Sequence, residues 1–571
     1  MRPGKSSLVC FYVHVFDYSY LLEPTGSGKV EQQEQKNSSD ELVLPEAADS
    51  GYGADAYNNG EMPLTFYIWS MTDLQDIMDH PLKAMVVVLS LLLLILLGSP
   101  TGRAADSKHK EFTVLDMRSL KPHAACTGHR VTPPHNGSWV PLYHPLGPCS
   151  PSYRRAAAKV KKPSLAKLLR QDRLRVRHIH RKASGGHVDE SKGSRKEPVT
   201  VEETQVHHQA AISVQWGTQS MGSFQQVPWP AADDGTSGGP PAVAQTVVLD
   251  TGSDVPWVEC VPCALAECPY YDPTRSSTYF AFPCNSTACK QLGPYANGCA
   301  NNQCQYRVVS SVDGSVSSGT YSSDVLTINS GNSIASFKQF GCNTQSQNSG
   351  DGGPTNGVMA LGRGAQSLTA QTSSTYGDAF SYCLPQKDYE KGFFKIGVPS
   401  GAAYRFAMTP LLRDRPGGPT PSATVYRVRM VAVTVNGQPL NVAAEAFAAG
   451  TVVDSVTVIT RLPLTVYGAL RAAFRDRMAG YRRAPPQEYL DTCYDLTGVR
   501  FVKLPRIALV FDRKAVVEID RSGILLENGC LAFAANDDDS KPAILGNTQQ
   551  KTIEVLHDVG GGNMGFRRLA C

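Results

Sequence analysis

Apolar residues in this chain fall mostly in short runs bounded by turn-forming residues, a pattern typical of β-strands. Residues 211–214 read as one strand, and 426–429 and 431–435 alternate as strands leading into a turn at Asn436-Gly437. Sustained helical spacing is rare outside residues 155–182. The 50 glycines and 38 prolines agree with many turns. The pattern predicts a mostly β protein.

Two of the apolar runs end on a carboxylate. Residues 247–249 lead into Asp250-Thr251-Gly252, and 451–453 lead into Asp454-Ser455-Val456. One such string can be an ordinary turn. Here, however, each copy is followed about a hundred residues later by two apolar residues and a glycine, at 360–362 and 544–546. The repeat predicts two similar lobes that each contribute one carboxylate to a shared site.

The strongest helical pattern lies in a basic stretch ahead of these motifs. Leu165, Leu168, Leu169 and Val176 have helical spacing within residues 105–205. Twelve Lys and Arg residues between 154 and 182 face only Asp172 among acids. A solvated helix or a nucleic-acid-binding run would look similar, although a net charge of +4 over 571 residues does not favour nucleic acid. Ahead of two candidate catalytic carboxylates, a propeptide is the better interpretation.

The first hundred residues contain a candidate leader. The apolar run at 84–97 follows Lys83 and ends in small residues, and its length suits a signal peptide better than a membrane span. We therefore assign 85–104 to a signal peptide. An uncleaved signal anchor, which would tie the protein to a membrane, is the alternative. Residues 1–84 have no assignable fold, and Met85 would be a natural start, so they can be a gene-model artefact.

The cysteines indicate an oxidising compartment. Twelve of the 15 lie after residue 255, an even and clustered set that favours disulfides over zinc, because no second matching pair accompanies Cys260-x-x-Cys263. Asn285 begins an Asn-Ser-Thr glycosylation acceptor if the chain is secreted. The disulfide candidates are Cys260, Cys263, Cys268, Cys284, Cys289, Cys299, Cys304, Cys342, Cys383, Cys493, Cys530 and Cys571.

These features together resemble one protein family. The paired Asp motifs, the cysteine-rich insert at 260–304 and the His-Pro-Leu-Gly-Pro-Cys string at 144–149 resemble plant nepenthesin-like aspartic proteases of the pepsin (A1) family. The resemblance covers residues 140–571. It implies a bilobal, mostly β fold with the site in the cleft between lobes, a basic propeptide at 105–205, and lobes at 206–408 and 409–571. A Gly/Pro-rich insertion at 219–240 departs from the family pattern.

The resemblance also implies the chemistry. Asp250 and Asp454 would share a proton, one activating a water while the other donates to the scissile carbonyl. Thr251 and Ser455 would hold the two loops by hydroxyl hydrogen bonds. Gly252 would let a backbone approach the acids, and the Ser253 hydroxyl would support Asp250. No cofactor or metal is implied. The expected partners are a polypeptide substrate and the chain's own propeptide, which acid would release. No nucleic-acid partner is expected. The expected state is a monomer, secreted to the apoplast or held in a vacuole.

Two departures weaken the expectation of catalysis. Val456 stands where the family has glycine, so we expect crowding, and strain if that position needs positive φ. In the flap string Ser311-Val312-Asp313-Gly314-Ser315, Ser311 replaces a tyrosine that would pair with Trp257. The alternative hypothesis is therefore a weakened or inactive homologue that binds a protein, as the related plant xylanase inhibitors do.

Overall fold

The computed structural model divides the chain into two units, 1–103 and 104–571. It describes residues 112–121, 123–131, 139–151, 164–184, 211–216, 244–261, 270–310, 316–328, 334–344, 355–397, 405–412 and 424–571. The leader, the insertion at 219–240, Cys263, Cys268 and the flap string 311–315 lie outside these ranges. Within them, no helix is both long and apolar enough to cross a membrane.

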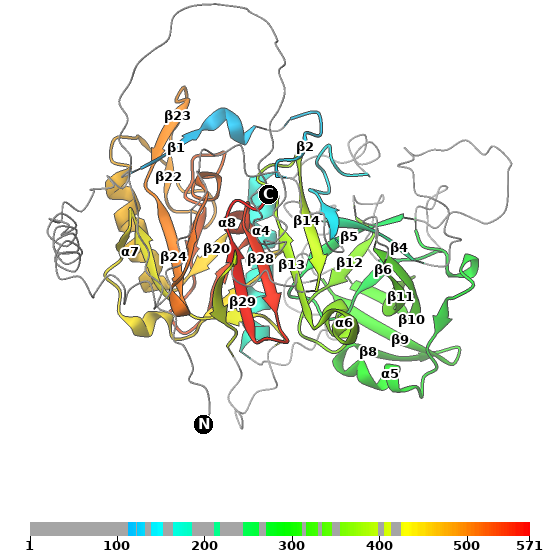
Figure 1. Ribbon diagram of the computed structural model, residues 1–571. Coiled ribbons are helices and arrows are strands. Elements are labelled where there is room, and N and C mark those ends of the chain that lie inside the picture. The colour runs from blue at the N-terminus through cyan, green and yellow to red at the C-terminus, as the bar shows by residue number, and fades with distance from the viewer. Residues whose placement is uncertain are drawn as a thin grey trace, which may run out of the picture. The chain divides into compact units, whose positions relative to one another are not determined.

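The described part of the chain is mostly β, as the apolar pattern predicts (Figure 1). Its strands form several sheets, and the helices are few and mostly short. The α-helices are α4 (Leu165–Ala183), α5 (Thr287–Gln291), α6 (Leu368–Tyr376), α7 (Leu464–Arg477) and α8 (Asn547–Gln550).

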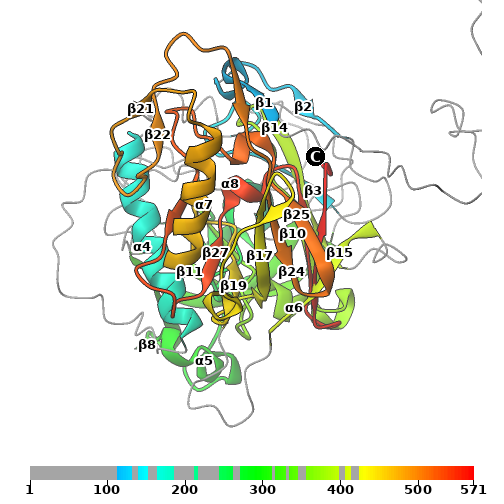
Figure 2. The ribbon, with the colours of Figure 1, turned by 90° about the vertical axis from the view of Figure 1, so that its left-hand side faces the viewer.

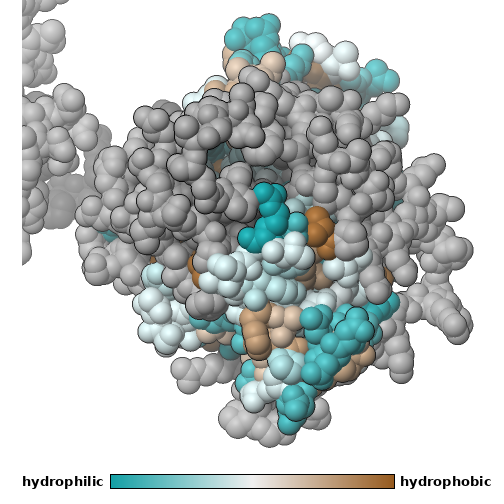
Figure 3. Space-filling model, turned by 90° about the vertical axis from the view of Figure 1, so that its right-hand side faces the viewer, coloured by the Kyte–Doolittle hydropathy of each residue, from teal (hydrophilic) through white to brown (hydrophobic). Residues whose placement is uncertain are grey.

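The first lobe is built on a nine-stranded sheet that carries the first Asp motif. Its order is β11-β6-β12-β5-β4-β10-β9-β8, with β7 paired to β10. On the side that bears β8 and α5, hydrophilic and hydrophobic areas alternate over the described surface (Figure 3). The strands are β4 (Ala211–Trp216), β5 (Ala244–Asp250), β6 (Trp257–Glu259), β7 (Phe280–Ala281), β8 (Ala296–Ala300), β9 (Gln303–Val309), β10 (Val316–Ile328), β11 (Ile334–Asn343) and β12 (Gly357–Ala360).

The second lobe contains a five-stranded sheet, β16-β19-β27-β20-β26, and a four-stranded sheet, β18-β17-β24-β25. The predicted turn at Asn436-Gly437 joins β17 to β18, and both residues have positive φ (52° and 81°), as a tight hairpin requires. The strands are β16 (Arg427–Val428), β17 (Met430–Val435), β18 (Gln438–Pro439), β19 (Thr451–Val453), β20 (Thr460–Leu462), β24 (Ile507–Phe511), β25 (Ala515–Glu518), β26 (Phe533–Ala535) and β27 (Ala543–Leu545). A small hairpin pairs β21 (Arg483–Ala484) with β22 (Cys493–Tyr494).

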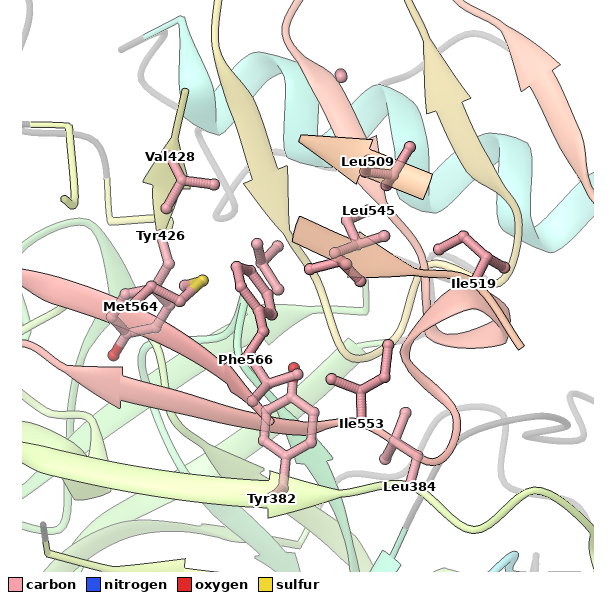
Figure 4. Close-up of a cluster of buried hydrophobic side chains, with 14 of the residues drawn as sticks. Tyr382, Leu384, Tyr426, Val428, Leu509, Ile519, Leu545, Ile553, Met564 and Phe566 are labelled. Carbon is pink, nitrogen blue, oxygen red and sulfur yellow. The ribbon is translucent and has the colours of Figure 1, made fainter. Parts of the chain in front are cut away.

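A seven-stranded sheet joins the lobes. Its order is β15-β29-β28-β13-β14-β2, with β3 also paired to β14. Side chains such as Met564 and Phe566 meet Leu509 and Leu545 of the second lobe in the main hydrophobic core (Figure 4). The strands are β2 (Gly128–His129), β3 (Trp139–Leu142), β13 (Ala379–Cys383), β14 (Glu390–Ile396), β15 (Ala407–Pro410), β28 (Glu554–Asp558) and β29 (Asn563–Arg567).

The basic propeptide-like stretch has two structured parts. Residues 112–151 contribute β1 (Thr113–Asp116), which pairs with β23 (Phe501–Leu504), as well as β2 and β3. The predicted helix is α4, a single unbroken helix that begins after Ser164, whose Oγ accepts a hydrogen bond from the Lys167 backbone N–H at 3.3 Å (Figure 2). Leu168 and Leu169 pack against Val458 and Ile459 in a second-lobe cluster.

Among the residues that the structure describes, six disulfides connect twelve cysteines. Five pairs join cysteines that the sequence analysis named as disulfide candidates without their connectivity: Cys260–Cys342, Cys284–Cys299, Cys289–Cys304, Cys383–Cys571 and Cys493–Cys530. The sixth, Cys126–Cys149, was not among the predictions and closes a loop within the N-terminal segment. Since Cys260 is bonded to Cys342, it is not available to a zinc site.

Candidate active site

Parallel strand pairs deliver both Asp residues to the site. Asp250, at the end of β5, lies in register with Ala360 of β12, and Val453, which precedes Asp454, lies in register with Leu545 of β27. The apolar strings downstream of each motif therefore lie beside it. Their glycines are needed for close approach: a Cβ on Gly362 would lie 2.5 Å from the Ser253 carbonyl oxygen. A Cβ on Gly546 would lie 2.9 Å from the Val458 oxygen.

The second residue of each motif ties the two loops together. The Thr251 backbone N–H donates to Ser455 Oγ at 3.1 Å, and the Ser455 N–H donates to Thr251 Oγ1 at 3.0 Å. Ser455 Oγ also donates to the Leu249 carbonyl at 2.9 Å. The two hydroxyls thus form hydrogen bonds between the lobes and fix the spacing of the carboxylates. The family resemblance implies this loop-holding arrangement for Thr251 and Ser455.

Each carboxylate is oriented by its own loop. Asp250 accepts from the Gly252 N–H at 2.8 Å and from Ser253 Oγ at 2.6 Å. Asp454 accepts from both the backbone N–H and the Oγ1 of Thr457, at 2.8 and 2.6 Å. Thr457 was missed in the sequence analysis, although a hydroxyl residue three positions after each Asp was a readable signal.

A guanidinium from α4 joins the two carboxylates. Arg175 Nη2 donates to Asp250 Oδ1 and to Asp454 Oδ1, at 2.6 Å in both cases. Its Nη1 donates to Asp250 Oδ2 at 3.0 Å, and its Nε to Asp454 Oδ2 at 2.9 Å. The Arg175 side chain is only 1% exposed. One buried cation therefore pairs with both acids in two-pronged fashion, an arrangement that gives strong charge-assisted hydrogen bonds.

The electrostatics of the site follow from this contact. Burial alone raises the pKa of the Asp250 carboxyl, but the Arg175 charge and hydrogen bonds from Arg175, Ser253 and Gly252 outweigh it, so the pKa is lowered. Burial likewise lowers the pKa of Arg175, and the two carboxylates overcome it and raise that pKa. Asp250 is thus held ionised while α4 is in place.

Two further α4 side chains hold the helix against the two loops. Asp172 accepts from the Val458 N–H at 2.6 Å and from Arg461 Nη2 at 2.8 Å, next to the second loop. Lys182 Nζ donates to Asp254 Oδ2 at 2.6 Å and to the Gly252 carbonyl at 2.9 Å, next to the first. The helix thus pairs its Asp172 carboxylate with Arg461 of the second lobe and its Lys182 ammonium with Asp254 of the first lobe.

Val456 is accommodated without backbone strain. Neither Val456 nor Gly252 is among the positive-φ residues, so the third motif position does not require glycine for its backbone. The expected strain at Val456 is therefore not found. Val456 is buried, with 4% of its surface exposed. At Gly252, by contrast, a Cβ would lie 2.4 Å from Arg175 Nη2 and 2.8 Å from Ile179 Cδ1.

The other predicted site residues are placed as follows. Trp257 is half-buried in β6 and packs against a first-lobe cluster that includes Tyr306 and Tyr321. The flap residues Ser311, Asp313 and Gly314 lie outside the described residues. Asn285 is exposed at the start of α5. Of the basic residues before residue 183, sequence reasoning did not single out Arg175 or Lys182.

Comparison with known proteins identifies the family. An aspartyl protease family protein of Arabidopsis thaliana is 32% identical over 505 residues, covering 85% of this chain and 98% of the relative. The chain belongs to the plant aspartyl protease family. The protease AED1 of the same plant is also 32% identical, over 83% of this chain and 94% of its own length. Nepenthesin-2 of Nepenthes gracilis is 28% identical over 58% and 76% of the two chains.

Other matches describe the same protease-family fold. The family descriptions "Xylanase inhibitor N-terminal" and "Xylanase inhibitor C-terminal" match residues 236–398 and 425–568. The crystal structure of edgp has a TM-score of 0.50 at 20% identity, over 63% of this chain and 92% of that one. At that identity the structural likeness supports the bilobal fold alone. The resemblance to plant nepenthesin-like aspartic proteases is thereby confirmed.

Proposed function

We propose that this protein is an aspartic endopeptidase that acts at acid pH and is made as a zymogen, with α4 as its inhibitor. The observation that supports this most is that both Asp250 Oδ1 and Asp454 Oδ1 contact one atom, Arg175 Nη2. Two carboxylates that reach one bridging nitrogen can also reach one bridging water. The geometry therefore supports a pair of carboxylates placed for catalysis, with the Arg175 guanidinium at the position that a bridging water would take.

Once Arg175 leaves, a water held at the place of its Nη2 would be the nucleophile. The ionised carboxylate takes a proton from this water as its oxygen bonds to the scissile carbonyl carbon, and the protonated carboxyl donates to the carbonyl oxygen. The tetrahedral intermediate then collapses. Its C–N bond breaks as the amide nitrogen takes the proton that the first carboxylate removed from the water. A hydroxyl of the intermediate returns a proton to the second carboxylate, leaving a new carboxyl and a new amine. Two carboxylates this close together cannot both ionise easily, which favours a shared proton in acid.

Acid would release α4 in two stages. Burial first lowers the pKa of His180 in α4, from 6.5 to about 4, so the bound helix resists a proton that the free helix accepts. Binding of α4 therefore weakens as the pH falls from 6.5 to about 4. Asp250 has a lowered pKa while paired, so the Arg175 contact is fully stabilising above the ordinary carboxyl value of 3.8 and is lost as the pH falls below it.

The disulfides favour a location outside the cytosol. Disulfides form and persist in secreted proteins and in other oxidising compartments. The described residues of this chain contain six disulfides. We propose that the protein is secreted or vacuolar.

A second candidate function is a non-catalytic protein-binding homologue. Val456 supports it, because the second motif carries this branched side chain at the position where the first motif has Gly252. The match to the xylanase-inhibitor family descriptions is compatible with it too. In this case the cleft surface would bind a protein without hydrolysing it.

The test is hydrolysis of a denatured protein by the purified precursor across roughly pH 2.5–7, the range in which carboxyl dyads titrate. The endopeptidase proposal predicts acid-range cleavage that pepstatin blocks and that Asp250→Asn abolishes. Folded, disulfide-bonded protein that cleaves nothing at any pH would contradict the proposal and favour the binding function.

A further inference from the structure

We propose that residues 112–151 are a permanent, non-covalently bound part of the mature protein, which stays on the two lobes after α4 has been cut away. The proposal concerns the two-part architecture of the propeptide-like stretch. It rests on the proposed removal of α4, but it assigns the N-terminal segment to the mature body rather than to the inhibitor.

The segment completes two sheets of the body. Strand β1 pairs antiparallel with β23 over four residues, from Thr113 opposite Leu504 to Asp116 opposite Phe501. Strand β3 pairs antiparallel with β14 over four residues, and β2 pairs with β14 in parallel. Removal would leave β23 and one side of β14 as exposed edges, which proteins normally keep covered.

The segment also supplies core side chains. Leu115, Val140 and Leu142 are at most 1% exposed and belong to the main hydrophobic cluster that includes residues of both lobes. Trp139 packs against the Cys383–Cys571 disulfide. Burial of apolar side chains of this size stabilises the folded state, and their loss would open cavities in the core of the body.

Polar contacts extend the attachment around the rest of the segment. Cys149 Sγ lies 3.2 Å from the Tyr389 carbonyl, and Arg130 Nη1 donates to Gln386 Oε1 at 2.9 Å. Gly147 packs so closely that a Cβ there would lie 1.9 Å from the Asp388 carbonyl oxygen. The Cys126–Cys149 disulfide braces the segment internally, so no covalent bond would tie it to the lobes after cleavage.

The two parts of the stretch are held by different forces. Beside its apolar packing through residues such as Leu169 and Ile179, α4 contacts the dyad and its surroundings through ion pairs of Arg175, Lys182 and Asp172. The contacts of residues 112–151 are mainly backbone ladders and apolar burial, which do not titrate. The exceptions are the surface Asp116–Arg500 ion pair, at 3.8 Å, and His129, whose pKa is lowered by burial and by the nearby Lys391. Most of the attachment of the N-terminal segment is therefore insensitive to the acid that loosens α4.

The experiment uses the full precursor carrying Asp250→Asn, with sites for a sequence-specific protease inserted within 152–163 and 185–205. After cutting, the products are separated by size exclusion at about pH 7.5 and about pH 4.5, either side of the histidine pKa. Intact masses are then measured after denaturation without reduction. The expected result is that the fragment containing 112–151 co-elutes with the body at both pH values.

Two variants sharpen the test on one strand. Leu115→Ala removes a buried side chain and should weaken retention of the fragment by about 30-fold or more. Val114→Ala, its neighbour at 38% exposure, should change retention by no more than about twofold. Separation of the wild-type fragment from a body that stays folded would overturn the proposal, as would equal effects of the two variants. Because the cut is made by an added protease, absence of intrinsic proteolytic activity does not affect the outcome.

Discussion

The two aspartate loops share a frame but differ in how each orients its acid. In the first, Asp250 is held by residues two and three positions later, Gly252 and Ser253. In the second, Thr457 alone provides both the backbone and hydroxyl donors. The second loop can therefore carry Val456 without losing these donors. Because a Cβ on Gly252 would overlap Arg175 and neither third residue has a positive φ, glycine in the first loop serves the close approach of Arg175 rather than the backbone conformation.

The largest effect is expected from removing either acid. Asp250→Asn and Asp454→Asn should each lower kcat at acid pH by about 10³-fold or more, because each leaves one carboxyl without its proton-transfer partner. Rates of peptide hydrolysis at the pH optimum measure this. Asp254→Asn is not a suitable control, since Asp254 binds Lys182. Asp272→Asn is the matched one, because Asp272 caps the short 3-10 helix Pro273–Arg275 and asparagine is an equally good cap. A large loss from only one acid would break the symmetry of the pair.

Exchanging the third motif residues tests what glycine is for. Gly252→Ala should weaken α4 binding by roughly tenfold or more, because the added Cβ would overlap Arg175 and Ile179. Val456→Gly should instead raise kcat/KM, by about tenfold, by opening the cleft. Protease protection of α4 and hydrolysis rates distinguish the two. Unchanged protection of α4 in Gly252→Ala together with an unchanged hydrolysis rate in Val456→Gly would show that the third position is indifferent in both loops.

The hydroxyl three residues after the first acid should tune its pKa. Ser253→Ala removes a hydrogen bond that lowers the pKa of Asp250, so the acid limb of the kcat/KM profile should move up by about one pH unit. Ser253→Thr copies the residue used by the second loop and should leave the limb in place. An unchanged profile for Ser253→Ala would mean that Asp250 is not the group whose ionisation limits the rate.

The smallest effect concerns the α4 contact beside the second loop. The ring of His180 lies 3.1 Å, at Nε2, from the Pro542 carbonyl, just before β27. Burial lowers the pKa of His180 to about 4 and that of His178, on the same helix, well below its ordinary value. Each ring should therefore weaken wild-type α4 binding by up to tenfold per pH unit as the pH falls from 6.5 to about 4. His180→Gln keeps a donor and should remove this share of the pH dependence. Hydrogen exchange of the α4 amides across this pH range is the measurement. If His180→Gln leaves the slope of α4 protection against pH unaltered, His180 does not contribute to the pH dependence of α4 binding.

Much of the fold and the dyad could be predicted because they depend on local repeats. A short apolar strand ending in Asp, with a second apolar pair and glycine downstream, specifies the parallel pairing that places Asp250 and Asp454. Arg175 could not be chosen from twelve basic residues, because its role depends on the rotation of α4 in the cleft. The pairing of β1 with β23 is similarly long-range, between residues 113–116 and 501–504. Nothing in the local sequence specifies it.

The central claim is that one guanidinium closes a dyad that is otherwise assembled. The most direct measurement is the initial rate of peptide hydrolysis by Arg175→Gln and wild-type precursors at about pH 5.5, above the range in which paired Asp250 titrates. Arg170→Gln is the control, since Arg170 is 72% exposed on the same helix. We expect cleavage by Arg175→Gln and little by the other two. Equal rates in all three would contradict the inhibitory role of Arg175, and silence from folded Arg175→Gln at every pH would contradict an assembled catalytic dyad.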